Sequence, residues 1–218
     1  MSKIDEILAR KIENGREYRR IEVNNIEIRE SQSDEERIVE GYATKFNQPY
    51  ELYNWGDYVV NEQIDGRAFD DCDMSDTIMQ YDHRGRVFAR VSNKTLELSV
   101  DSVGLKVRAN LGGTEAGRQL YEEIKGGYTT KMSFGFIVEE DVRTYTENHE
   151  TNVTTVLRNI TKIKKLYDVS AVSLPANDAT EISARNFSEG VIEEIRKEIA
   201  AAEERKKQID KVKLLCNI

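Results

Sequence analysis

The segment from Lys131 to Val138 alternates large apolar residues with small or polar ones, and this period of two predicts a β-strand. Its apolar members share one face and are Met132, Phe134, Phe136 and Val138. That face is expected to pack on a hydrophobic core. Ser133 and Gly135 share the other face, where the glycine leaves the surface clear beside the serine hydroxyl. Such a strand builds a core and also presents a hydroxyl where a substrate could reach it.

The composition is that of one globular domain with charged appendages. A chain of 218 residues can bury one sizeable core, and 39% of this one is hydrophobic. The charged fraction of 33% is high, which indicates that part of the chain is a solvated helix or tail. The formal net charge of -8 argues against nucleic acid as a partner, because a basic excess is needed to release counterions from the phosphate backbone.

The cysteines and the first residues bear on where the protein works. Cys72 and Cys216 lie far apart and have no metal-ligand spacing, so we expect free thiols in a reducing compartment. Residues 1–20 are charged throughout and lack the apolar core of a signal peptide. No apolar window reaches the length of a membrane span. We therefore expect a protein of the cytoplasm, or of a particle assembled there, without a membrane partner.

The rest of the central sequence predicts many short strands and one helix. Further segments with strand patterns lie at residues 21–28, 38–43, 96–100, 105–109, 141–145, 153–160 and 166–174. The helix is predicted from Glu115 to Lys125, with Thr114 as its N-cap and Gly126-Gly127 at its end, and Leu120 and Ile124 facing inward. These elements predict an α+β fold, a mainly antiparallel β-barrel or sandwich with flanking helices.

The predicted organisation has three parts: an N-terminal helical arm at residues 1–20, a central domain at 21–186 and a charged C-terminal helix at 187–218. The arm is predicted to contain a short amphipathic helix at residues 2–12. The C-terminal helix has isoleucines at helical spacing with charged residues between them. Its apolar seam degrades toward the end, so any coiled coil would be weak. We expect this helix to dock to a partner and to be removable.

An aromatic-rich segment from Pro49 to Ala68 predicts a long irregular loop. Long loops often carry function, because a rigid scaffold can present binding groups on them. The aromatic rings of this segment either cap one end of a barrel or line a substrate groove, and the sequence leaves both open.

Ser133, His83 and Asp168 supply the three parts of an activated serine nucleophile: a hydroxyl, an imidazole and a carboxylate. His83 follows an apolar stretch at what looks like a strand end, whereas His149 lies in a polar turn where its ring is most simply solvated. A lone histidine also has a purely structural interpretation, so these residue types alone do not settle the chemistry.

Three other chemistries fit the sequence less well. Scattered carboxylates at Asp71, Asp73 and Asp82 with His83 make a poor zinc set, so no metal or cofactor is expected. A dyad of Cys72 with His83 would need a lowered thiol pKa, yet the neighbouring aspartates would raise it. An esterase of the α/β-hydrolase type would need a Gly-x-Ser-x-Gly elbow, which the chain lacks.

Several motifs together, in order and spacing, resemble the prohead (capsid maturation) proteases of tailed bacteriophages from about Ile38 to Arg185. The motifs are Asp82-His83, Asn93-Lys94-Thr95-Leu96, Val103-Gly104-Leu105-Lys106-Val107, Ile124-Lys125-Gly126-Gly127, Met132-Ser133-Phe134-Gly135-Phe136 and Asp168-Val169-Ser170-Ala171-Val172-Ser173-Leu174-Pro175-Ala176-Asn177. The resemblance implies a serine endopeptidase with a fold like that of herpesvirus assemblin. Such enzymes cut scaffold or the scaffolding segment of the major capsid protein, and then themselves.

Carried over by position, the resemblance implies that Ser133 is the nucleophile, His83 the general base and Asp168 the third residue. The family more often has glutamate at the last position, and aspartate is one methylene shorter. By analogy with assemblin, Ala176 or Asn177 would supply a backbone N–H to an oxyanion hole.

The resemblance also implies capsid and scaffold partners, self-association and a place inside the assembling procapsid in the host bacterial cytoplasm. No cofactor is implied. A competing interpretation is a non-enzymatic scaffold or capsid-assembly module that uses the C-terminal helix for interaction.

Overall fold

The computed structural model describes residues 16–21, 27–29, 36–54, 58–173, 197–201, 204–205 and 207–209. The predicted helix at residues 2–12, Cys216 and both oxyanion candidates, Ala176 and Asn177, lie outside the described residues. Within the predicted C-terminal helix the described residues are helical, but the greater part of that helix also lies outside them.

The described chain is mostly β-structure with a single complete helix. In order, the elements are β1 (Arg16–Ile21), β2 (Glu27–Arg29), β3 (Ile38–Lys45), β4 (Tyr50–Asn54), β5 (Tyr58–Ile64), β6 (Ile78–Tyr81), β7 (Arg84–Arg90), β8 (Leu96–Val100), β9 (Gly104–Asn110), α2 (Glu115–Lys125), β10 (Lys131–Asn148) and β11 (Val153–Val172).

The strands form two sheets, not the closed barrel that the sequence predicted. One sheet has seven strands, with β1-β10-β11-β5-β4 as its main path and β6 and β7 attached through β11; the other has four, in the order β2-β3-β9-β8. An isolated parallel bridge between Phe46, which follows β3, and Ile64 of β5 links the two sheets at one point, but no ladder between described strands closes them into a barrel. Most neighbours are antiparallel as predicted, but β11 pairs in parallel with both β5 and β6.

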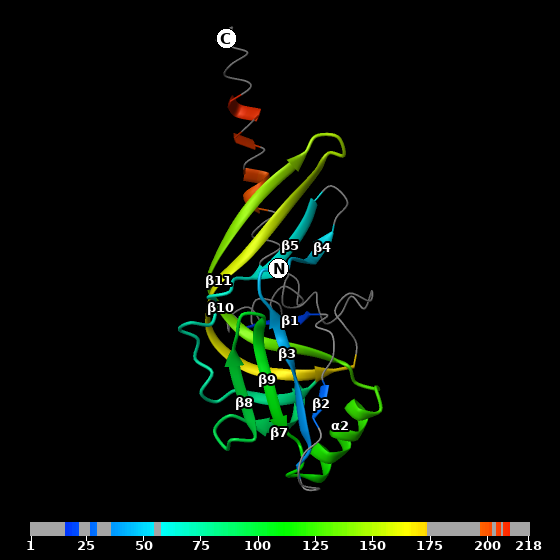
Figure 1. The fold of residues 1–218 in the computed structure, drawn as a ribbon. Coiled ribbons are helices and arrows are strands. Elements are labelled where there is room, and N and C mark those ends of the chain that lie inside the picture. The colour runs from blue at the N-terminus through cyan, green and yellow to red at the C-terminus, as the bar shows by residue number, and fades with distance from the viewer. Residues whose placement is uncertain are drawn as a thin grey trace, which may run out of the picture.

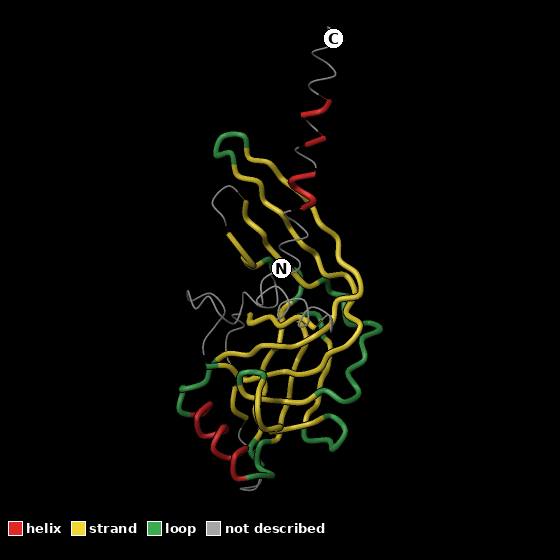
Figure 2. The backbone as a smooth tube through the Cα atoms, turned by 180° about the vertical axis from the view of Figure 1, so that it is seen from behind, coloured by secondary structure: helices red, strands yellow, loops and turns green. Residues whose placement is uncertain are grey.

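A long hairpin of β10 and β11 runs through the whole molecule (Figures 1 and 2). The sequence predicted two shorter strands in place of each. Register shifts between Gly135 and Asp141 explain the difference, because bulges bend a strand and interrupt its alternation without ending it. Below the bend the hairpin packs on the core. Above it β11 pairs with β5, and β5 pairs with β4. These strands project together as the distal arm, made of residues 50–54, 58–64 and 141–160.

The main core fills the space between the two sheets and under α2. Met132, Phe134 and Phe136 belong to it and are buried, which confirms the predicted core face of this strand. Helix α2 begins and ends where predicted: Thr114 Oγ1 accepts a hydrogen bond from Gly117 N at 3.0 Å, and Leu120 and Ile124 are buried. Local capping signals thus placed this helix correctly.

Three predictions about the secondary structure were wrong. The segment from Pro49 to Ala68 is not an irregular loop, because β4 and β5 occupy much of it and pair with each other. Residues 16–20, assigned to the helical arm, lie in β1. Strand β7 was not predicted at all. Each of these segments is rich in charged or polar residues, so it shows little of the apolar alternation by which a strand is recognised in a sequence. Its extended conformation is stabilised by pairing with a neighbouring strand.

The distal arm has a small apolar cluster of its own. Val60 and Val156 are buried there, and Leu52 and Ile199 pack against them. Glu198 accepts hydrogen bonds from Arg143 Nη1 at 2.7 Å and from Tyr145 Oη at 2.5 Å. These contacts attach the helical residues 197–201 to the distal arm.

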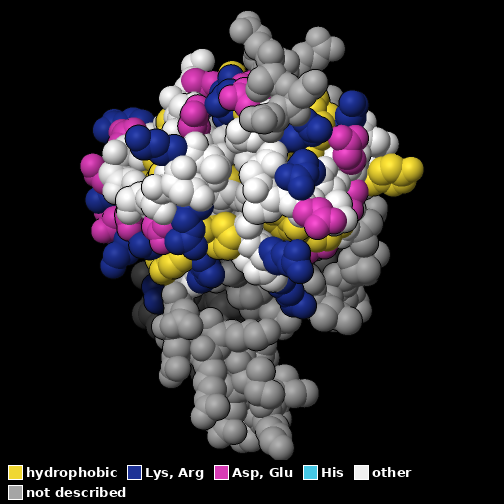
Figure 3. All heavy atoms as spheres, turned by 90° about the horizontal axis from the view of Figure 1, so that it is seen from below, with side chains coloured by type: hydrophobic (Ala, Val, Ile, Leu, Met, Phe, Trp, Pro, Cys, Tyr) yellow, Lys and Arg dark blue, Asp and Glu magenta, His cyan; other side chains and the backbone are white. Residues whose placement is uncertain are grey.

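Charges of both signs are interspersed on the face seen from below (Figure 3). Among the described helices, none has both the length and the apolar character required to cross a bilayer.

Candidate active site

Ser133 lies on β10, in the half of the strand that crosses the core. Its neighbours across the sheet are Arg20 on β1 and Ser170 on β11. Gly135 lies opposite Asp168 on the same pair of strands. Residues directly opposite each other in an antiparallel pair project from the same face. Ser133, Asp168 and Ser170 therefore share the sheet face that points away from the phenylalanines, as the alternation predicted for the serine.

His83 lies in a tight turn between β6 and β7. Asp82 and His83 have φ values of 47° and 58°, the signature of a two-residue hairpin loop in which both central residues are left-handed. A histidine seldom adopts this conformation, and such residues are held in place by their surroundings. Here the turn is fastened to the end of β11: Asp82 N donates to Ala171 O at 3.0 Å, and the Asp82 carboxylate accepts from Ser173 N at 3.1 Å and Ser173 Oγ at 2.9 Å.

The parallel pairing of β6 with β11 brings the His83 turn to Asp168. Ile78 is the register partner of Asp168, and Tyr81, two residues before His83, is the partner of Ala171. The imidazole ring turns back over the sheet, and its Nδ1 lies 2.5 Å from Asp168 Oδ1. Aspartate therefore reaches the histidine directly, although it is one methylene shorter than glutamate.

The other ring nitrogen, Nε2 of His83, lies 2.6 Å from Ser133 Oγ. An ionised carboxylate can only accept hydrogen bonds, so Nδ1 carries the proton that is donated to Asp168. In the neutral ring Nε2 is then an acceptor, and the Ser133 hydroxyl donates to it. This order of hydroxyl, imidazole and carboxylate can move a proton from the serine to the histidine.

Ser133 and Asp168 are buried in this structure, and His83 is largely buried. Ser133 has no exposed surface, and the side chains of His83 and Asp168 are 9% and 1% exposed. The sequence had predicted an accessible serine, so in this respect it was wrong. Burial strengthens the electrostatic contacts among the three groups by removing water.

Arg16 of β1 adds a positive charge at the acid. Its Nη2 lies 3.9 Å from Asp168 Oδ2, and its guanidinium lies 3.8 Å from the centre of the Tyr167 ring. A cation at this distance attracts the carboxylate electrostatically. No local pattern predicts this contact, since it depends on the pairing of β1 with β10.

The other candidates considered from the sequence lie elsewhere. His149 is exposed in the turn between β10 and β11. Asp73 forms an ion pair with Lys165 at 2.7 Å, and Asp71 lies 3.7 Å from Lys162. Burial raises the pKa of the Cys72 thiol to about 12, which keeps it protonated and unreactive near neutral pH. The prediction that this pKa is raised is confirmed, with burial and not the aspartates as the main cause.

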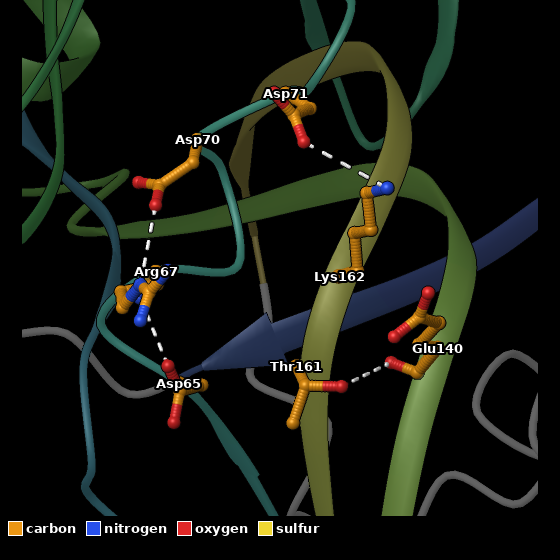
Figure 4. A pocket seen from close by; sticks show the side chains of 7 residues that line it. All are labelled: Asp65, Arg67, Asp70, Asp71, Glu140, Thr161 and Lys162. Carbon is orange, nitrogen blue, oxygen red and sulfur yellow. Dashed lines mark hydrogen bonds and ion pairs between the residues drawn. The ribbon is translucent and has the colours of Figure 1, made fainter.

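A pocket of about 400 Å³ lies apart from these three residues (Figure 4). It is lined by Asp65, Arg67, Asp70, Asp71, Glu140, Thr161 and Lys162. Several of its charged groups pair with one another: Arg67 Nε donates to Asp70 Oδ2 at 3.4 Å, and Lys162 Nζ lies 3.7 Å from Asp71 Oδ2. The pocket does not include any of the residues predicted to be catalytic.

Comparison with known proteins identifies the family. The model of the caudovirus prohead serine protease family matches residues 24–197 of this chain. No curated protein sequence matches the chain. The solved structure of the capsid assembly protease of bacteriophage T4 aligns with a TM-score of 0.43 and 11% identity, over 72% of this chain and 96% of that one. The family match covers most of the chain, and the protein belongs to the caudovirus prohead serine proteases.

Proposed function

We propose that Ser133, His83 and Asp168 are the catalytic triad of this prohead protease. The observation that carries the proposal is the unbroken contact chain, with 2.6 Å from Ser133 Oγ to His83 Nε2 and 2.5 Å from His83 Nδ1 to Asp168 Oδ1. The positions of the three residues also support it. Ser133 and Asp168 lie on the paired strands β10 and β11, and His83 lies in the β6–β7 turn, which is hydrogen-bonded to the end of β11. A rigid support is what a catalytic arrangement needs.

In the proposed reaction, Ser133 Oγ attacks the carbonyl carbon of a peptide bond while its proton passes to His83 Nε2. A tetrahedral intermediate forms, and its collapse breaks the C–N bond as His83 returns the proton to the leaving amine. The acyl group then stays on Ser133 until a water molecule, deprotonated by His83, attacks it. The C–Oγ bond breaks, the acid product leaves, and His83 returns the proton to Ser133 Oγ. Asp168 holds Nδ1 protonated throughout and stabilises the imidazolium that forms in each half of the reaction.

The developing oxyanion needs hydrogen-bond donors, which in serine proteases are usually backbone N–H groups. We assign this task to Ala176 or Asn177. The assignment rests on their place after Pro175 in the family motif and on the fact that β11 ends at Val172, close in sequence to them.

The substrates we propose are scaffold protein or the scaffolding segment of the major capsid protein, together with the protease itself. Membership of the prohead protease family supports this choice, and we propose that the enzyme acts inside the assembling procapsid in the host cytoplasm. Self-association and a docking role for the C-terminal helix belong to the same proposal. The contacts of Glu198 and Ile199 with the distal arm support an attached state of that helix before cleavage.

Co-expression of the full chain with the capsid and scaffold proteins of the same phage tests this function. We expect wild-type protein to shorten at least one of them, and Ser133→Ala protein to leave all of them intact. The matched control is Ser75→Ala, an exposed serine that bonds only to Asp73 among the described contacts. Cleavage that persists at the wild-type rate in Ser133→Ala protein would rule out the assigned nucleophile.

Intact-mass analysis of the same proteins tests self-cleavage. We expect the wild-type chain to lose mass on incubation, while the Ser133→Ala chain keeps its full mass. If both the wild-type and the Ser133→Ala chains kept their full mass after prolonged incubation, the result would argue against self-cleavage. It would not contradict the assignment of the triad.

A further inference from the structure

Ser170 is a buried polar residue to which the proposed mechanism gives no task. It lies on β11 two residues after Asp168, between Ser133 on one neighbouring strand and Gln80 on the other. Its side chain has no exposed surface. A buried hydroxyl needs a hydrogen-bond partner, and the choice of partner shows what the hydroxyl does.

The partner of Ser170 is the proposed triad acid. Ser170 Oγ donates to Asp168 Oδ1 at 2.8 Å, within the buried part of the site. The same oxygen accepts the Nδ1 proton of His83 at 2.5 Å. Asp168 Oδ2, in contrast, has no hydrogen-bond partner among the described residues, and its closest described cation is Arg16 at 3.9 Å. The two short hydrogen bonds therefore converge on one oxygen.

This convergence fixes the orientation of the carboxylate. The terminal torsion of an aspartate is soft and roughly two-fold, so one bond to a histidine leaves the group free to twist about it. A second donor on the same strand removes that freedom, since Ser170 and Asp168 project from one face of β11 at a fixed spacing. Gly135, which lies opposite Asp168, carries no side chain that could do this.

We propose that Ser170 is a positioning residue of the triad: its hydroxyl holds the Asp168 carboxylate so that Oδ1 faces Nδ1 of His83. The inference rests on the proposed function, because it assumes that Asp168 acts through His83. The alternative is that Ser170 merely satisfies its own hydroxyl in a buried place. In that case its loss lowers stability but not the rate per folded molecule.

The reactivity of Ser133 toward a small alkyl fluorophosphonate separates these two roles without any knowledge of the natural substrate. In this reaction the Oγ–P bond forms, the P–F bond breaks, fluoride leaves and the serine proton passes to His83. The full-length protein is labelled at fixed pH, Ser133 is identified as the modified residue by peptide mass mapping, and the melting temperature of every variant is recorded.

Ser170→Ala is expected to lower the labelling rate about tenfold, the effect of losing one hydrogen bond to a charged group. Ser170→Thr keeps the hydroxyl and is expected to restore most of the rate. Ser170→Cys offers a weak donor of similar size and is expected to fall between them, which keeps the test decisive if the alanine variant fails to fold. The matched control is Thr44→Val, which removes a buried hydroxyl of β3 in the other sheet and is expected to change stability only.

A double-mutant cycle completes the test. In an Asp168→Asn background, Ser170→Ala is expected to cause no further loss of rate, because the group that Ser170 orients is no longer a carboxylate. A Ser170→Ala protein that labels at the wild-type rate would overturn the positioning role while leaving the triad in place. Wild-type protein that is not labelled at Ser133 would overturn the proposed function, and this inference with it.

Discussion

His83 and Asp168 are 85 residues apart in the sequence, yet the Nδ1 atom of one lies 2.5 Å from the Oδ1 atom of the other. The parallel pairing of β6 with β11 produces this contact, because it places the β6–β7 turn beside the last part of β11. The turn itself is fastened by Asp82 to Ser173. The imidazole is thus positioned both by its hydrogen bond to Asp168 and by the turn that carries it, and its other nitrogen contacts the hydroxyl of Ser133.

The two histidines are expected to behave in opposite ways when they are replaced. His83→Ala removes the proposed base and should reduce cleavage by a factor on the order of 10⁶, as loss of the base does in a serine protease. His149→Ala changes an exposed turn far along the distal arm and should leave the rate unchanged. The measurement is the rate of capsid or scaffold cleavage per folded molecule. An essential His149 with a dispensable His83 would contradict the assigned base.

Replacement of Asp168 tests the third position. Asp168→Asn keeps the shape but cannot hold the productive tautomer, so the rate should fall by a factor on the order of 10⁴. Asp168→Glu adds a methylene to a side chain that is 1% exposed and already in direct contact with His83, so it should also be slowed and less stable.

The fluorophosphonate labelling rate and the melting temperature are measured for both Asp168 variants, so that an effect on the rate is separated from an effect on stability. If Asp168→Asn lowered the melting temperature alone, the site would be a dyad of Ser133 and His83, with Asp168 as a structural residue.

Asp82 is expected to position the base through the backbone. Asp82→Ala removes two hydrogen bonds that fasten the left-handed turn to Ser173, so His83 should sample more positions. We expect the cleavage rate to fall by about ten- to a hundred-fold. This is the size of effect expected from the loss of one to two hydrogen bonds to a charged group. The control is Asp76→Ala, a change at an exposed ion pair with Arg90 that should leave the rate intact. Equal rates for both variants would show that the turn holds its shape without Asp82.

Arg158 is expected to be the most costly single charge to remove. Its side chain is 2% exposed and contacts Glu17 of β1, Glu62 of β5 and Asp141 of β10, at 2.7 to 2.8 Å. Arg158→Met leaves the buried Glu62 and the partly buried Glu17 and Asp141 close together without this cation, which should destabilise the fold by roughly 3–5 kcal/mol.

Denaturant unfolding of the intact chain measures this cost. The control, Arg90→Met, breaks an ion pair at a side chain that is 39% exposed, and should change stability by less than about 1 kcal/mol. A similar small change at Arg158 would mean that the carboxylates protonate or find water when the arginine is lost.

Local patterns in the sequence were sufficient to predict those elements that depend on interactions between residues close together in the chain. Helix α2 follows from Thr114, which caps its first turn, and from the glycines that end it. The buried face of Met132, Phe134 and Phe136 follows from alternation alone. The triad candidates rested on the resemblance to a family, because no short-range rule says that a serine, a histidine and an aspartate so far apart will meet.

Only the tertiary structure decided which strands became neighbours. The parallel pairing of β11 with β6, the stacking of two open sheets and the bend of β10 all depend on contacts between residues distant in the chain, and a period of two is the same for every partner. For the same reason the sequence placed Ser133 at an open surface, whereas the fold buries it, and it gave Ser170 no part in the site. Side-chain alternation determines a face, but what covers that face is determined by the rest of the chain.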